Sequence, residues 1–378
     1  MISFETGAMI ALLVMISILL FTHRRKITFS RFFIFYAAMY RTKRGLSTMD
    51  RLAKKYQRMW ELLSVPIIVV GFLGMALVVE ELIRNLILLF IAQAPPGVGV
   101  VLPIQAKGVF YVPFFYWIIS IFAILIIHEG MHGVMARVYN LPVKSSGLVV
   151  IGALIPLIPG AFVEPDERKL ALASKKEQLA VYAAGPVSNI VTGILIALIV
   201  GFVVAPWTST FYANDGPVIT RLSGPDAPAA KAGLLEGDKI IAVNGEAVHN
   251  AAEFSTRLKD TKAGDVAIIR TAQNSYPVTL EEIDGRAKIG VYVETSLQNN
   301  SWWVYVVLWL EGLLGILGIL SIGVGLFNLV PLGPIDGGRM LLTGLQHVTH
   351  HKHAHLIWRS VSFVLVVVLI TQLIAAFV

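Results

Sequence analysis

Six long runs of apolar side chains limit the fold of this chain more than any other feature of its sequence. The runs are residues 9–21, 64–93, 112–139, 179–206, 302–329 and 356–378. A helix of about 20 consecutive apolar residues can cross the hydrocarbon core of a bilayer. The composition agrees, because 56% of the 378 residues are hydrophobic and 15% are charged. The sequence therefore predicts a polytopic α-helical membrane protein with about six transmembrane helices.

Basic residues predict how these helices are inserted. No basic residue precedes the first run and no small-residue cleavage site follows it, so we expect a membrane anchor and not a signal peptide. Eleven Lys/Arg and one acidic residue lie between His23 and Arg58, and more basic residues follow the third and fifth runs. Because Lys and Arg accumulate on the cytoplasmic side, we expect a multi-pass protein of the cell membrane with these segments inside and residues 208–301 outside.

The net charge of the chain then has a simple explanation. The basic segments that flank the apolar runs give the chain a formal charge of +7, whereas residues 208–301 carry nine Lys/Arg against twelve Asp/Glu. Basic segments beside transmembrane helices bind anionic lipid headgroups. The sequence predicts the lipid bilayer as a partner and no nucleic acid.

The external region 207–301 has the alternating short strands of a small β-rich domain, with a turn at Asn244-Gly245. Its segment SGPDAPAAKAGLLEGDKIIAVNGEAV, residues 223–248, resembles PDZ domains of prokaryotic proteases. That resemblance implies strand addition of a peptide or protein C-terminus, with a capture loop near residues 216–222. A domain that acts only as a steric spacer is the alternative.

One apolar run contains three ionisable side chains. In FAILIIHEGMHGVMARV, residues 122–138, His128 and His132 are four residues apart and so share one face of a helix. Two imidazoles on one face suit Zn²⁺, with Glu129 beside them as a base for bound water. Ionisable groups within a membrane span are costly and usually functional, although a buried polar cluster that pins helix contacts is the alternative. The chain has no cysteine, which excludes thiolate ligands.

A third zinc ligand is expected from the inner end of the fifth run. The segment FNLVPLGPIDGGRM, residues 327–340, contains one carboxylate, Asp336, among helix-breaking prolines and glycines. Irregular backbone at membrane depth is tolerated where protein or a water-filled cavity surrounds it; a simple helix stop is the alternative. His128 lies nine residues before Arg137, so at 1.5 Å per residue the metal would lie roughly 13 Å below the cytoplasmic boundary. Asp336 is expected near that boundary.

Together these residues resemble the site-2 protease family of intramembrane zinc metalloproteases. The family patterns are His-Glu-x-x-His, Gly-Pro-x-x-Asn and Asn-x-x-Pro-x-x-Pro-x-Asp-Gly. They are present here in residues 128–132, 185–189 and 328–337. The resemblance covers about residues 112–342, and it implies hydrolysis of peptide bonds in or near transmembrane segments of membrane-protein substrates, as in regulated intramembrane proteolysis.

The resemblance also implies roles for single residues. His128, His132 and Asp336 would hold one Zn²⁺ per chain, and Glu129 would pass a proton from the metal-bound water to the leaving amine. Asn189 and Asn328 would contact the substrate or the developing oxyanion, with an interhelical hydrogen bond as the alternative for Asn189. The active site is expected near the cytoplasmic side.

The predicted organisation has six parts. They are an anchor with a basic cytoplasmic loop (1–63), a second span with its external connection (64–111), the first half of the protease core (112–206), the PDZ domain (207–301), the second half of the core (302–345), and a His-rich loop with the last span (346–378). Residues 143–165 are poorly helical, and the family implies a re-entrant β-hairpin there, with a surface loop as the alternative.

Two further stretches stay ambiguous. Glu80 and Glu81 precede Arg84 within the second run, where we expect a self-paired helix face or an interfacial break. Residues 347–355 contain five histidines, expected as a solvated juxtamembrane loop, with metal buffering or pH sensing as the alternative. The alternative functions are a metal or proton transporter, for which no internal repeat is found, and a catalytically silent scaffold that uses only its PDZ domain.

Overall fold

The computed structural model of the protein describes residues 4–32, 35–92, 94–152, 156–283 and 286–377. The chain forms two compact units, one of Met1–Ile199 with Gly312–Val378 and one of Val200–Glu311. We call them the membrane unit and the β-rich unit. The second is close to the predicted domain 207–301.

The described residues contain six helices that are long and apolar enough to cross a membrane. They are α1 (Phe4–Thr22), α3 (Gln57–Ile91), α4 (Phe114–Val138), α6 (Lys175–Ile199), α10 (Trp302–Asn328) and α12 (His351–Phe377). Each overlaps one predicted run, so the predicted membrane-protein class is confirmed. In α3, Arg84 bonds Glu81 at 2.7 Å, which agrees with the expected self-paired helix face.

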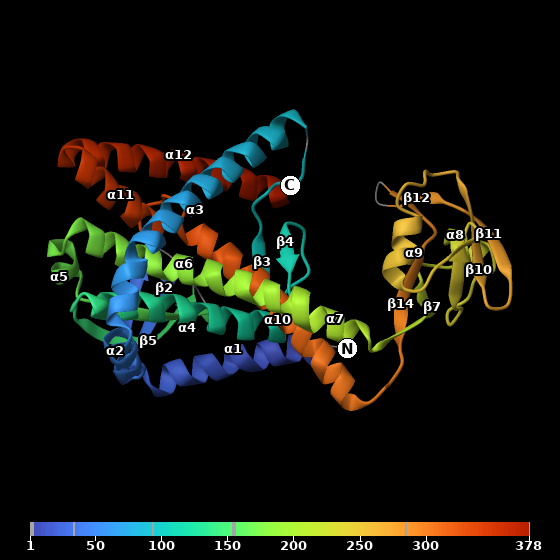
Figure 1. The fold of residues 1–378 in the computed structure, drawn as a ribbon, viewed down its shortest axis with the longest axis horizontal. Coiled ribbons are helices and arrows are strands. Elements are labelled where there is room, and N and C mark those ends of the chain that lie inside the picture. The colour runs from blue at the N-terminus through green and yellow to red at the C-terminus, as the bar shows by residue number, and fades with distance from the viewer. Residues whose placement is uncertain (1–3, 33–34, 93, 153–155, 284–285, 378) are drawn as a thin grey trace. The chain divides into compact units, whose positions relative to one another are not determined.

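Helices α4 and α6 run side by side in the membrane unit (Figure 1). Small residues allow α6 to approach its neighbours closely. An added Cβ on Gly193 would lie 2.7 Å from the carbonyl oxygen of Gly318 in α10, and one on Gly325 would lie 2.7 Å from that of Pro186. Close backbone approach at small residues is the usual way in which membrane helices pack. Helix α6 therefore contacts both α4 and α10.

The membrane unit also contains a four-stranded antiparallel sheet. Its strands, in spatial order, are β1 (Ile27–Phe32), β2 (Phe35–Thr42), β5 (Val143–Gly152) and β6 (Pro156–Pro165). The pair β5 and β6 is the predicted hairpin at residues 143–165. Strand β6 is at one edge of the sheet and packs against α4.

The basic segment between the first two spans contains regular secondary structure that was not predicted from the sequence. This segment contains β1, β2 and helix α2 (Leu46–Lys55). Aromatic and β-branched residues in ITFSRF and FYAAMYRT favour strands, and β5 provides the main-chain partner that a sequence pattern cannot show.

Side chains connect this N-terminal segment to the rest of the membrane unit. Arg41 bonds Glu164 of β6 at 3.1 Å, and Ser145 donates a hydrogen bond to the same carboxylate at 2.7 Å. The hydrogen bond from Ser145 is the largest cause that lowers the pKa of Glu164, and the hydrogen bond from Arg41 is the next. Arg137 at the end of α4 pairs with Asp50 of α2 at 2.9 Å. The N-terminal segment therefore forms ion pairs with both β6 and α4.

The β-rich unit has a core enclosed by short strands and two helices. The strands are β7 (Tyr212–Leu222), β8 (Ile240–Val243), β9 (Glu246–Ala247), β10 (Val266–Thr271), β11 (Ser275–Thr279), β12 (Glu281–Ile283), β13 (Arg286–Lys288) and β14 (Val291–Leu297). The helices are α8 (Pro228–Lys231) and α9 (Ala251–Arg257). Ile219, Ile240 and Ile269 are fully buried in the core. The expected turn at Asn244-Gly245 joins β8 to β9, with both residues at positive φ.

The prediction of a capture loop at residues 216–222 was wrong. These residues lie in β7, which pairs with β14 along its length. The β-branched run Val218, Ile219 and Thr220 favours a strand, and Ile219 is buried at 1% exposure. These residues are therefore a strand of the sheet and not a loop.

The predicted His-rich loop at residues 347–355 is helical as well. Helix α11 (Asp336–Val348) includes the first two residues of this stretch, and α12 includes its residues from His351 onwards. Two residues, Thr349 and His350, separate the helices. Polar composition suggested a loop, but histidine is compatible with exposed helical positions.

Candidate metal centre

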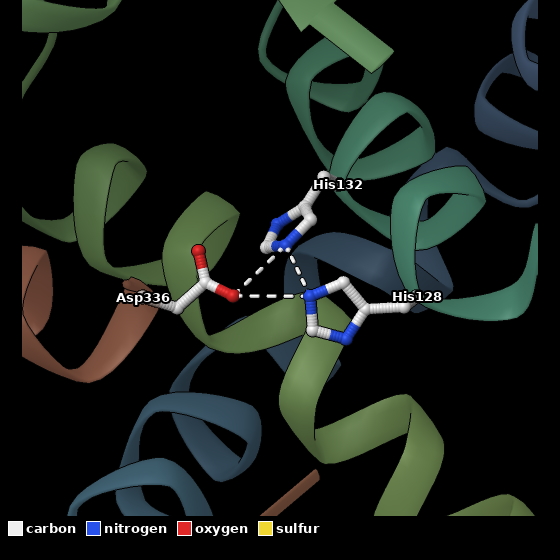
Figure 2. Close-up of side chains that lie close together, drawn as sticks. All are labelled: His128, His132 and Asp336. Atoms are coloured by element: carbon white, nitrogen blue, oxygen red, sulfur yellow. Dashed lines mark hydrogen bonds and ion pairs between the residues drawn. The ribbon is translucent and has the colours of Figure 1, made fainter. Parts of the chain in front are cut away.

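Three side chains from two distant segments meet inside the membrane unit. His128 and His132 extend from one face of α4, and Asp336 is the first residue of α11 (Figure 2). Asp336 Oδ2 lies 3.1 Å from His128 Nε2 and 3.2 Å from His132 Nε2, and the two Nε2 atoms are 3.2 Å apart. Both histidines are buried, at 5% and 9% exposure. The expected convergence of these three residues is present.

These separations fit a tetrahedral zinc site. Zn²⁺ bonds imidazole nitrogen and carboxylate oxygen at about 2.0–2.2 Å, which places two ligand atoms on a tetrahedron about 3.3–3.5 Å apart. Two nitrogens and one oxygen at 3.1–3.2 Å, all able to offer lone pairs, come close to that spacing. Among the described residues this is the one group of three or more possible ligands. The donor set leaves a fourth position for water, as catalytic zinc sites do.

The ring of His132 is held by the main chain of α6. Its Nδ1–H donates to the carbonyl oxygen of Val181 at 2.7 Å, which leaves the Nε2 lone pair for a metal. The ring packs directly over Gly185, where an added Cβ would overlap Nε2. A glycine at position 185 therefore leaves the space that the imidazole of His132 occupies.

The ring of His128 contacts the same helix one turn further along. Its Nδ1 lies 3.0 Å from the carboxamide of Asn189, which has 0% exposure. Asn189 was predicted to contact substrate or a developing oxyanion. In the structure its side chain lies against a proposed metal ligand.

Two glycines and an arginine position Asp336. An added Cβ on Gly337 or Gly338 would overlap main-chain atoms of Leu329 or Leu332, so both positions require glycine for the chain to turn into α11. One turn later, Arg339 bonds Glu167 of α5 (Glu167–Leu172) at 3.0 Å and lies over the ring of Tyr182 in α6, 5.6 Å from its centre. The start of α11 is thus fixed to α5 and α6.

Glu129 lies beside the group and contacts the sheet. Its Oε2 accepts a hydrogen bond from the main-chain N–H of Val163 in β6 at 2.9 Å. The predicted base is therefore next to the outer edge of β6. Asn328 lies at the end of α10, and its Nδ2 donates to the carbonyl oxygen of Val324 at 3.0 Å. Its predicted substrate contact stays a prediction.

Sequence patterns did not indicate several of these supporting groups. The carbonyl of Val181 and the amide of Val163 are main-chain atoms, which leave no side-chain signal. Arg339 follows Asp336 by three residues in the sequence, and that spacing could have marked it as a neighbour on the first helical turn.

A family model described as peptidase family M50 matches residues 116–369. An uncharacterized protein of Methanocaldococcus jannaschii is 29% identical over 315 residues, which are 79% of this chain and 74% of that protein. The zinc metalloprotease RasP of Geobacillus kaustophilus is 26% identical over 236 residues, covering 49% of this chain and 54% of RasP. The regulator of sigma-W protease RasP of Bacillus subtilis is 24% identical over 263 residues, which are 55% of this chain and 61% of that protein.

The chain thus spans between about half and three fifths of the length of these two RasP proteins. Among solved structures, the PDZ domain of an SdrC-like protein from Listeria monocytogenes is 26% identical with a TM-score of 0.20. The match covers 21% of this chain and 87% of that domain.

Proposed function

The chain belongs to peptidase family M50, and from this membership we propose that it hydrolyses peptide bonds in or near transmembrane segments of other membrane proteins. The family match and the names of the bacterial relatives confirm the predicted protein class, a zinc metalloprotease. They favour this function over the transporter and the silent scaffold. The observation that carries the proposal is the convergence of two imidazoles and one carboxylate inside the membrane unit.

His128, His132 and Asp336 would hold the zinc ion. When bound there, zinc would polarise the scissile carbonyl and lower the pKa of a coordinated water towards 7. Glu129, which follows His128 in the chain, would hold the proton taken from that water and deliver it to the leaving amine. Zinc ligation by Asp336 together with the two histidines is supported by the 3.1–3.2 Å separations.

The outer edge of β6 is the proposed binding site for an extended substrate strand. Because the N–H of Val163 bonds Glu129 and not β5, the odd-numbered residues of β6 direct their main-chain groups outwards. A substrate segment that pairs with this edge would lie next to Glu129. Peptide bonds within a helix are shielded by their own hydrogen bonds, so unwinding onto an edge strand gives the catalytic groups access.

The substrates proposed on this basis are single transmembrane segments. The distribution of basic residues supports a site near the cytoplasmic side and an external β-rich unit. A role in regulated intramembrane proteolysis, in which a cut releases a domain from the membrane, follows from this arrangement as a proposal.

The test compares wild type with Glu129→Gln in reconstituted vesicles that contain a single-span substrate. Glu129→Gln is expected to keep about one zinc per chain by elemental analysis and to lose cleavage, because the amide cannot accept the proton. Chelation of zinc should stop wild-type cleavage, and added zinc should restore it. Unchanged cleavage by Glu129→Gln would refute the assignment.

A second proposed function is peptide binding by the β-rich unit. A groove runs between α9 and β14 and is lined by apolar residues that include Phe254, Leu258 and Val291. Strand β14 pairs with β7 on one side. An extended peptide could add to β14 along this groove, as in PDZ domains. The groove replaces the capture loop expected at residues 216–222.

The charge of the groove favours an acidic peptide. Residues 208–301 carry nine Lys/Arg and twelve Asp/Glu, yet the charged residues that line the groove in the described part of the chain are four bases and one acid. They are Lys259, Lys262, Arg286, Lys288 and Glu282. A basic groove on an otherwise acidic unit complements acidic side chains or a terminal carboxylate.

The test uses the full-length protein in detergent and two labelled peptides of equal length. One peptide has an acidic C-terminal segment, and the other carries the corresponding amides. We expect roughly tenfold tighter binding of the acidic peptide, with a difference that shrinks as salt is added. Lys259→Glu should abolish the difference, whereas Arg270→Glu, an exposed cation on β10 outside the groove, should not. Equal binding of both peptides would contradict the proposal.

A further inference from the structure

Asn189 contacts the side of the His128 ring that is opposite the proposed metal. His128 Nδ1 faces the Asn189 carboxamide at 3.0 Å, and His128 Nε2 faces Asp336 at 3.1 Å. We infer that Asn189 is a positioning residue that accepts a hydrogen bond from His128 Nδ1–H and so presents the Nε2 lone pair to zinc. The inference rests on the proposed metal site and gives Asn189 a role other than the predicted substrate contact.

The chemistry of imidazole requires such a partner. A neutral ring has one N–H donor and one lone-pair acceptor. If Nε2 binds a metal, Nδ1 carries the proton, and a buried N–H without an acceptor is costly. Histidine ligands in metalloproteins usually donate this proton to a carbonyl or carboxylate oxygen, which fixes the ring and its tautomer.

Asn189 supplies an oxygen that can accept this proton. Its Oδ1 is buried and has no hydrogen-bond partner among the described residues. A half-turn of the carboxamide exchanges Nδ2 and Oδ1 and places the oxygen against Nδ1–H at the distance that the structure gives. The two amide orientations have nearly the same shape, so the tautomer of the neutral His128 ring decides between them.

The spacing along α6 supports the same role. Gly185 lies under His132 and Asn189 lies beside His128, so residues four apart on α6 meet residues four apart on α4. His132 already donates its Nδ1–H to the carbonyl oxygen of Val181. Helix α6 therefore contacts both imidazoles on the side away from the metal, once through its main chain and once through Asn189.

Burial argues against a direct contact between Asn189 and substrate. The residue has 0% exposure, and Ser321 of α10 donates a hydrogen bond to its main-chain oxygen at 2.8 Å. Its side chain lies behind His128 as seen from Asp336. A substrate strand at β6 would meet His128 and Glu129 before it could reach Asn189.

The test measures Zn²⁺ affinity of full-length protein in detergent by competition with a chelating dye. Asn189→Leu, similar in size but without an acceptor, is expected to bind zinc 10–100-fold more weakly, the range typical for loss of a residue that supports a metal ligand. Asn189→Asp keeps the acceptor and should stay within about threefold of wild type. Cobalt substitution gives a second readout, because the absorption of bound Co²⁺ should change in the leucine variant and be retained in the aspartate variant.

Ser188→Ala is the matched control. It removes a side-chain hydrogen bond to the carbonyl oxygen of Gly185 on the same helix but touches neither imidazole through its side chain, so its zinc affinity should equal that of wild type. Wild-type zinc affinity in Asn189→Leu with a reduced kcat would assign Asn189 to the substrate and overturn the inference. Equal weakening in both Asn189 variants would reduce its role to packing and would also overturn it. Zinc affinity is measured without cleavage, so failure of the proposed proteolysis would remain a separate result.

Discussion

Two helices of the membrane unit carry a pair of histidines four residues apart, and only one pair is gathered into a possible metal site. His128 and His132 in α4 are buried and meet Asp336. His351 and His355 in α12 have the same spacing but are exposed. In the part of the chain that the structure describes, no third ligand joins this second pair.

The difference shows that spacing is the smaller part of a metal site. The α12 pair is exposed, so its ring nitrogens can hydrogen-bond to water and do not require partners in the protein. The α4 pair is removed from water, and each Nδ1 must find a partner in the protein. Helix α6 supplies those partners through Val181 and Asn189, and α11 supplies the carboxylate. The following predictions test that difference, from the largest expected effect to the smallest.

Asp336→Ala should make the α4 pair resemble the α12 pair. With two imidazoles left, we expect zinc affinity to fall by more than about 100-fold, beyond the 10–100-fold typical of losing a supporting residue. Dye-competition titration of the purified protein measures this. If the variant keeps zinc with wild-type affinity, the carboxylate is not a ligand and the comparison loses its basis.

Gly185→Ala should displace His132 from α6. The added methyl group would overlap His132 Nε2, so the ring must leave its place, and we expect zinc affinity to drop by about 100-fold. Gly130→Ala is the matched control, since a Cβ there meets nothing within 4 Å and should leave affinity unchanged. Tight zinc binding by Gly185→Ala would show that the ring has another productive position.

Val163→Pro should weaken proteolysis without removing the metal. Proline deletes the N–H that bonds Glu129 but is tolerated where that N–H faces out of the sheet, and loss of one such bond corresponds to roughly tenfold in kcat/KM. Val163→Ala keeps the N–H, reduces the side-chain packing and serves as control. Equal rates for the two variants would mean that the edge amide does not contribute to catalysis.

The double variant His351→Ala/His355→Ala should change almost nothing. We expect one tightly bound zinc per chain and wild-type cleavage, because both rings are exposed and no third possible ligand joins them among the described residues. Elemental analysis after gel filtration measures the zinc content. A loss of stoichiometric zinc would show that the α12 pair is a real site and would end the comparison.

The sequence indicated the proposed metal ligands better than the groups that support them. His128 and His132 stood out because charged groups are rare in apolar runs, and Asp336 because prolines and glycines interrupt the next segment. Six apolar helices followed from length alone. The joining of β1 and β2 to β5 did not follow, because it depends on a main-chain partner about a hundred residues away. Nor did the placement of Asn189 behind His128, which depends on how α6 packs against α4.

The outward-facing positions of β6 include two prolines. Because Val163 faces out, residues 159, 161 and 165 do so too, and residues 159 and 165 have no N–H to give. Of the outward positions that do carry an N–H, Val163 already donates to Glu129, so the proposed substrate strand would find few open amide donors along this edge. An edge strand with so few donors is poorly suited to edge-to-edge pairing with another copy of the chain. We expect this edge to pair with only a short unwound segment of a substrate. The position at which a substrate helix unwinds would then determine the cleavage site more than its amino-acid sequence does.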